Sequence, residues 1–176
     1  MILGELMLLL DQIRCLVQGF SLLQLRAALS DGIVTPDDLP EILGQAVFMK
    51  RVDVVDALLD GGFIGVNVRN RNGLAPLEIA IETLDKQVVS HLLDKGAQLN
   101  GTGANGLTPL HAAIDTEVEA ALCDRDRTGT NVAPASIIST LLLERGADKR
   151  ARSIRGETPL DFARRRGHLT AAAILQ

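Results

Sequence analysis

The chain has 176 residues, of which 47% are hydrophobic and 23% are charged, and its formal net charge at pH 7 is −4. A chain of this length can bury a core as one domain, and because only 2% of the residues are aromatic, that core has to consist of Leu, Ile, Val and Ala. The negative charge and the lack of aromatic residues for base stacking argue against a nucleic-acid-binding protein. No run approaches the roughly 20 apolar residues of a membrane helix.

The first elements predicted are two helices with no repeat signature. Apolar residues recur at three- and four-residue intervals over residues 2–17, which indicates an amphipathic helix, and a second helix is predicted from Ser21 to Leu29. The apolar run from Leu6 to Leu10 has no basic segment before it, so we expect no export signal. Cys15 and Cys123 match no metal-binding spacing and are expected to be reduced thiols in a cytoplasmic protein.

One short string then occurs three times, as NGLAPLEIA at 72–80, NGLTPLHAA at 105–113 and RGETPLDFA at 155–163. It combines a Gly suited to positive φ with a capping Thr and a Pro at the first helical position, so it predicts a turn that leads into a helix. Gly73 and Gly106 are 33 residues apart. The apolar runs LLDGG, LLDKG and LLERG are separated by 34 and then 50 residues, which indicates one repeat with an insert.

A period near 33 with these helix starts resembles the ankyrin repeat, in which a β-turn is followed by two antiparallel helices. The resemblance covers roughly residues 40–176 and includes GAD at 146–148 and RGH at 166–168. It implies an all-α, ankyrin-type helical solenoid with β-turn fingers and about four repeats. Ala75 departs from the capping Thr, and Glu78 and Asp161 replace the usual His. In this family, the residue at the position of His111 usually ties neighbouring turns together by hydrogen bonds.

The predicted organisation is a single domain that begins with a helical N-terminal cap at 1–34. It continues with a degenerate repeat at 35–71, a regular repeat at 72–104, an enlarged repeat at 105–154 and a C-terminal repeat at 155–176. The degenerate repeat starts at Thr35, Pro36 and Asp38, a Thr cap followed by a first-position Pro and a third-position Asp. Its helices are expected near 39–50 and 52–59, and those of the next repeat near 76–84 and 86–95. A terminal cap of this kind covers the apolar end of a repeat stack.

The insert lies in the third repeat. Pro76 to Leu92 spans 16 residues whereas Pro109 to Leu142 spans 33, so 17 extra residues fall around 115–134. Helical spacing continues through Val118 and Leu122, which predicts an inner helix lengthened by two turns or more. A polar loop is predicted at 125–134 and the second helix at 135–145.

The insert and the residues near it do not form a recognisable chemical site. His111, Cys123, Asp124 and Asp126 offer ligand-type atoms, but no paired metal spacing connects them, and charged residues in a surface loop are normally solvated. Gly101 and Gly103 belong to a repeat turn rather than to a phosphate-binding loop. We therefore expect no catalytic residues, no metal and no cofactor.

Charge is segregated along the chain. Residues 148–176 hold seven basic and three acidic residues, a net charge of +4. Because the whole chain has a net charge of −4, the other residues have a net charge of −8. This is either a solvated terminal face or a basic patch for an acidic partner surface.

The family resemblance implies a non-catalytic protein-binding module, an adaptor or an inhibitor, that uses turn tips and inner helices. The matching positions are Arg69, Arg71, Asn72, Leu74, Glu82, Thr83, Ala104, Asn105, Leu107, Asp115, Thr116, Arg152, Ile154, Arg155, Glu157, Arg165 and Arg166. The expected partner is another protein, with no nucleic acid and no membrane, and the unbound chain is expected to be a monomer. An immunity protein that neutralises a cognate bacterial toxin is the alternative, and an enzyme or effector that uses the insert is a further one.

Overall fold

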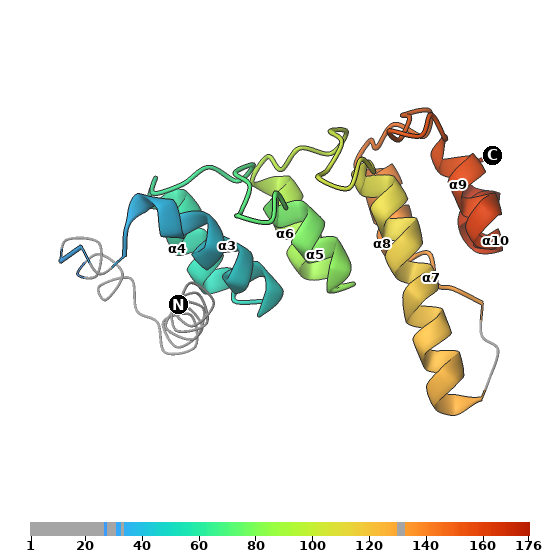
Figure 1. Ribbon diagram of the computed structural model, residues 1–176, viewed down its shortest axis with the longest axis horizontal. Coiled ribbons are helices and arrows are strands. Elements are labelled where there is room, and N and C mark those ends of the chain that lie inside the picture. Colours follow the sequence, from blue (N-terminus) through green and yellow to red (C-terminus); the bar gives the residue numbers. More distant parts are fainter. Residues whose placement is uncertain (1–26, 28–30, 33, 130–132) are drawn as a thin grey trace, which may run out of the picture. The chain divides into compact units, whose positions relative to one another are not determined.

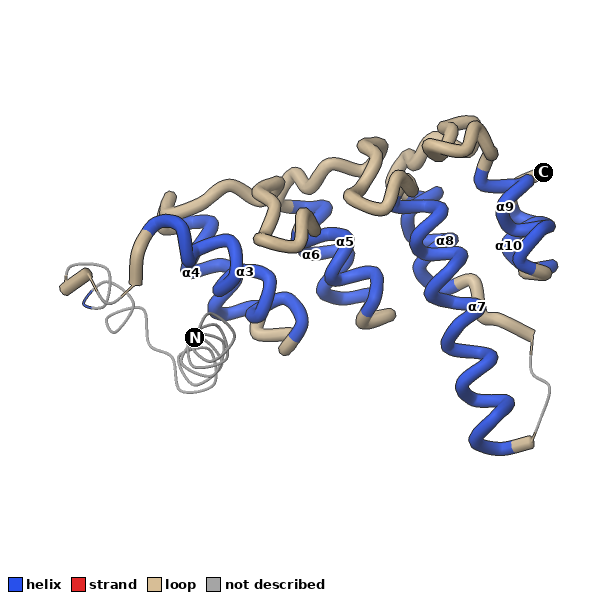
Figure 2. Tube along the Cα trace, viewed as in Figure 1, coloured by secondary structure: helices blue, strands red, loops and turns tan. Residues whose placement is uncertain are grey.

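The computed structural model describes residues 27, 31–32, 34–129 and 133–176, so almost all of the predicted N-terminal cap at 1–34 lies outside the described residues. The chain divides into two compact units, Met1–Pro76 and Leu77–Gln176, which are described separately below. The described residues form helices and turns but no strand (Figures 1 and 2), which agrees with the all-α prediction.

The first unit contains a short 3-10 turn, η1 (Pro36–Asp38), followed by α3 (Leu39–Phe48) and α4 (Val52–Asp60). Asp38 accepts hydrogen bonds from the backbone N–H of Thr35 at 3.0 Å and from its hydroxyl at 2.7 Å, as a third-position acid is expected to do. The helices α3 and α4 pack against each other, and Ile42, Leu43 and Leu58 are fully buried. The degenerate repeat therefore has the predicted pair of helices.

Apart from Pro76, the first residue of α5, the second unit contains the remaining helices: α5 (Pro76–Glu82), α6 (Lys86–Asp94), α7 (Pro109–Thr128), α8 (Ile137–Glu144), α9 (Pro159–Arg166) and α10 (Leu169–Ile174). The inner helix α7 packs against α9 and against α8, and α8 in turn contacts α6 and α10. The core of this unit is aliphatic, with Ile81, Leu92, Leu110, Ile114 and Leu142 fully buried. This agrees with the prediction that the core consists of aliphatic side chains, which was based on the small number of aromatic residues.

The three turns that precede α5, α7 and α9 share one hydrogen-bond pattern. In the turn before α7, the N–H of Gly103 donates to the carbonyl of Leu107 at 2.8 Å, and the N–H of Gly106 donates to the carbonyl of Gly103 at 2.9 Å. In the turn before α5, the N–H groups of Asn70 and Gly73 donate the equivalent two bonds, and in the turn before α9 those of Ser153 and Gly156 do so. Gly106 has a φ of 73°, which is why glycine recurs at this position of the string.

The lengthened inner helix predicted from the insert is present, but the polar loop begins later than residue 125, where it was predicted to begin. Figure 1 shows α7 extending well past α8, and the helix includes Arg125 to Thr128, which were predicted to lie in a polar loop. Asp124 and Arg127 form an ion pair of 2.9 Å within this last turn. Gly129, with a φ of 70°, then ends the helix by donating its N–H to the carbonyl of Arg125.

Candidate protein-binding surface

A groove of about 250 Å³ lies between two neighbouring turns and the inner helices behind them. Its walls come from the turn before α7, the turn before α9, the second turn of α7 and the middle and end of α9. Of the residues that line it, all except Phe162 were predicted as partner-binding positions: Asn105, Leu107, Asp115, Ile154, Arg155, Glu157, Arg165 and Arg166. The structure therefore gathers residues from two repeats into one depression.

The two turns are held together by a backbone hydrogen bond. The N–H of Ile154 donates to the carbonyl of Gly106 at 2.8 Å. A Cβ at Gly106 would collide with the side chain of Ile154, so glycine is required here for close approach as well as for its positive φ. The contact fixes the position of Ile154 but leaves its side chain at the surface, where it is 80% exposed.

Most charges in the groove are paired within the protein. Arg165 donates two hydrogen bonds to the carboxylate of Glu157, at 2.7 and 3.1 Å, and its guanidinium lies 4.8 Å from the ring centre of Phe162. The hydrogen bond from Arg165 lowers the pKa of Glu157. Arg166 forms a 2.6 Å ion pair with Asp115 and also contacts the carboxylate of Glu119.

Arg155 differs from the other two arginines of the groove. Its side chain is exposed and makes no hydrogen bond or ion pair with any residue in the described part of the chain. Arg155 follows Ile154 directly. The rim of the groove therefore carries an exposed aliphatic side chain beside a guanidinium that makes no hydrogen bond or ion pair with the described residues. A partner could bury the aliphatic side chain and pair a carboxylate with the guanidinium. Such a charge pair contributes specificity to binding.

His111 has the structural role that the family resemblance implied. Its Nε2 lies 3.0 Å from the carbonyl oxygen of Glu157 in the next turn, and its Nδ1 lies 2.7 Å from the hydroxyl of Thr108. Since a carbonyl only accepts, Nε2 carries the proton and Nδ1 accepts from Thr108. The ring is fully buried and meets Phe162 edge-on, and burial lowers its pKa. A neutral His111 thus links the start of α7 to the turn before α9.

The remaining predicted positions lie outside this groove. In the first unit, the guanidinium of Arg71 bonds to Asp38 at 2.9 Å and its backbone N–H bonds to Glu41 at 2.6 Å, while Arg69 donates to the carbonyl of Gly73. In the second unit, Arg152 donates to the carbonyl of Gly156. Asn72, Leu74, Glu82, Thr83, Ala104 and Thr116 also lie outside the groove and are all exposed or half-buried.

A buried carboxylate in α7 was not predicted. Glu117 accepts hydrogen bonds from the N–H groups of Ile138 and Ser139 at 2.7 and 3.1 Å, and from the hydroxyl of Ser139 at 2.5 Å. It also lies 3.2 Å from Nε2 of His168, and both side chains are buried. Ser136 is the N-cap of α8, but its side chain makes no capping hydrogen bond. The carboxylate of Glu117, on the neighbouring helix α7, instead accepts hydrogen bonds from the free N–H groups in the first turn of α8.

These contacts give Glu117 a structural role rather than a chemical one. The hydroxyl of Ser139 points at the carboxylate and not at a histidine, and Ser139 and His168 are fully buried. The burial of Glu117 could have been predicted from the sequence spacing, because Glu117 follows the buried Ile114 by three positions and so lies on the buried face of α7.

Across the described residues, no group of three or more His, Cys, Asp or Glu side chains could hold a metal ion. Cys123 is exposed on the last part of α7. None of the described helices is both long and apolar enough to cross a membrane.

Comparison with known proteins agrees with the geometry. The family described as ankyrin repeats (3 copies) matches residues 43–132, about half of the chain. The chain belongs to the ankyrin-repeat family. Two similar curated proteins are Tyrosine-protein kinase Shark of Drosophila melanogaster, 29% identical over 131 residues, and Alpha-latrocrustotoxin-Lt1a of Latrodectus tredecimguttatus, 34% identical over 68 residues.

Both relatives are far longer than their similar segments. The segments make up 74% and 39% of this ankyrin-repeat chain, but only 12% of the kinase and 5% of the toxin. The likeness therefore concerns the repeats. Ankyrin repeats indicate a protein–protein interaction module, in agreement with the prediction that the chain binds another protein.

Proposed function

We propose that the chain is a non-catalytic adaptor or inhibitor that binds its partner protein in the groove between the turns before α7 and α9. The observation that carries this proposal is the exposed pair on the groove rim, Ile154 and Arg155. Ile154 offers apolar area to a partner, and the removal of such area from water favours association. Arg155 offers a cation that has no competing hydrogen bond among the described residues.

The partner surface that suits this rim carries a carboxylate next to an apolar residue. Arg165 and Arg166 are already neutralised by Glu157 and Asp115, so Arg155 is the groove arginine that is available to an added anion. The last 29 residues also carry a net charge of +4, which favours the approach of an acidic surface.

An immunity protein that neutralises a cognate bacterial toxin is the second candidate. The segregation of a net +4 in residues 148–176 from −8 in the remainder favours it, because tight inhibitory complexes use such fields to speed association. Expression of the adjacent open reading frame, alone and together with this chain, separates the two candidates. The immunity proposal requires toxicity of the neighbour alone and relief of that toxicity on co-expression.

Site-specific photo-crosslinking tests the groove. A photo-reactive amino acid placed at position 154 and, in a control, at position 169 replaces an exposed aliphatic residue in both cases, since Ile154 is 80% and Leu169 is 76% exposed. Position 169 is at the start of α10, outside the groove. In cells of the native host, we expect one protein to be captured from position 154 and not from position 169. Capture of the same proteins from both positions, or no capture from 154, would contradict the proposal.

A further inference from the structure

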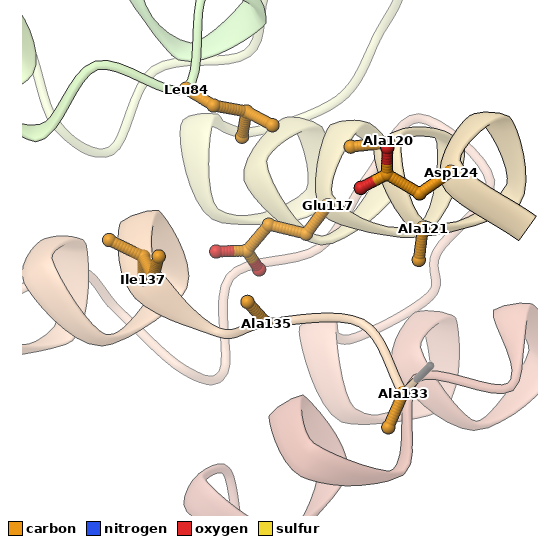
Figure 3. Close-up of a pocket in the computed structure, with 8 residues that line it drawn as sticks. All are labelled: Leu84, Glu117, Ala120, Ala121, Asp124, Ala133, Ala135 and Ile137. Atoms are coloured by element: carbon orange, nitrogen blue, oxygen red, sulfur yellow. The ribbon is translucent and has the colours of Figure 1, made fainter. Parts of the chain in front are cut away.

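A second cavity, also of about 250 Å³, lies beside the lengthened part of α7 (Figure 3). The described residues that form its apolar walls come from α7, from positions 133 and 135 before α8, from the start of α8 and from the turn between α5 and α6: Ala120, Ala121, Ala133, Ala135, Ile137 and Leu84. Four of these side chains are single methyl groups, so the space between the backbones stays open. Ile137 is 55% exposed at the cavity, although it begins a helix whose next residue is fully buried.

Leu84 occupies a backbone conformation that favours glycine. Its φ is 51°, and the equivalent position before α10 is Gly167, with a φ of 75°. The equivalent position before α4 is Lys50, with a φ of 58°, so this turn holds residues other than glycine, and at Leu84 it holds an apolar side chain. In Figure 3 the side chain of Leu84 lies on the α5–α6 side of the cavity, where it supplies an apolar wall.

Among the described residues, the charged groups that line the cavity are two carboxylates, Glu117 and Asp124. Glu117 has no capacity to spare, because its two oxygens already receive four hydrogen bonds from Ile138, Ser139 and His168. Asp124 lies near the rim, and its side chain is 62% exposed. Its partner Arg127 is 76% exposed, and an ion pair in such a position is weak and readily exchanged.

We propose that this cavity accepts the long basic side chain, a lysine or an arginine, of a bound protein. Its volume is below the roughly 300 to 1,000 Å³ typical of sites for drug-sized ligands, but is sufficient for one side chain. The alanine methyl groups and Ile137 contact the alkyl stem, and Asp124 pairs with the cation at the rim. Lysine and arginine bury their stems in this way while the charged end stays near water. The inference rests on the chain's binding a protein, but on a different surface from the groove.

The test uses butylammonium as the probe, with butanol and butyrate as neutral and anionic probes of equal chain length. Each is titrated into the full chain while NMR records the methyl signals of Ala120, Ala121, Ala133 and Ala135, which line the cavity. The buried methyl of Ala172 serves as an internal reference. We expect saturable shifts of the cavity methyls, with butylammonium binding about three- to fivefold more tightly than butanol and butyrate binding most weakly.

Matched variants assign the preference to Asp124. Asp124→Asn should bring butylammonium and butanol to equal affinity, whereas Asp126→Asn, which removes the same charge from an exposed residue that does not line the cavity, should leave the preference in place. Ala121→Leu fills the cavity and should abolish the shifts for all three probes.

Other outcomes overturn the proposal. Equal binding of butanol and butylammonium to the wild-type chain would mean that the cavity is merely apolar. An equal effect of the two Asn variants would assign the preference to the general field, and the absence of shifts would mean that the cavity is closed in solution. Because the probes are small, none of these results depends on the groove between the turns.

Discussion

Removal of the buried carboxylate of Glu117 should destabilise the second unit strongly. Glu117→Ala leaves the N–H groups of Ile138 and Ser139, the hydroxyl of Ser139 and the ring N–H of His168 without their acceptor. A buried donor left without a partner costs about 1 to 3 kcal/mol, and four such donors lose their acceptor when the Glu117 carboxylate is removed. We therefore expect a decrease of about 3 to 5 kcal/mol in the free energy of unfolding.

The control is Glu119→Ala, two positions further along α7. Glu119 pairs with Arg166, but its side chain is 57% exposed, so its loss should cost about 1 kcal/mol or less. Urea unfolding followed by circular dichroism at 222 nm measures both variants, and the absence of Trp and Tyr makes this signal preferable to fluorescence. Equal losses for the two variants, or a loss below about 1 kcal/mol for Glu117→Ala, would refute the role of Glu117 in capping α8.

Three further predictions concern the repeats, and each is measured as a change in unfolding free energy. Leu110 is 1% exposed, so Leu110→Ala should cost about 2 to 5 kcal/mol, and a loss below about 0.5 kcal/mol would show that it is not a core residue. Thr158 accepts a hydrogen bond from the N–H of Asp161 at the start of α9, so Thr158→Ala should cost about 1 kcal/mol. Burial lowers the pKa of His111 in the folded state, so the unfolded chain binds more protons below about pH 6.5. The stability advantage of the wild type over His111→Gln should therefore be fully present above pH 6.5 and shrink as the pH falls to 5, and a constant advantage would contradict a buried neutral ring.

The local helix starts were predictable because their determinants are adjacent in sequence. Thr158, Pro159 and Asp161 form the predicted cap, and α9 begins at Pro159 as expected. The residues of the groove were also predictable, because the repeat period brings Asn105 and Arg155 to equivalent positions in neighbouring turns. The ends of helices were less predictable: α3 stops at Phe48 rather than at residue 50, and α7 continues to Thr128.

The features that were not predicted depend on residues far apart in the chain. Glu117 meets Ile138 across 21 residues and His168 across 51, and no local rule pairs a carboxylate with a helix start at such separations. The same is true of Arg166, whose charge was counted as part of a basic region but is neutralised by Asp115. The second cavity escaped prediction because it arises where the lengthened α7 passes the start of α8, and depends on small side chains from separate segments.

The most direct test of the proposed function is the dissociation constant of the protein captured at position 154, measured by calorimetry with purified components. Arg155→Glu reverses the uncommitted charge on the groove rim, and Arg164→Glu makes the same change at an exposed residue of α9 that does not line the groove. If the partner binds in the groove, Arg155→Glu should weaken binding at least tenfold, while Arg164→Glu should change it less than about threefold; a tenfold change corresponds to about 1.4 kcal/mol. Equal effects of the two substitutions, or no effect of Arg155→Glu, would contradict the assignment of the groove as the binding site.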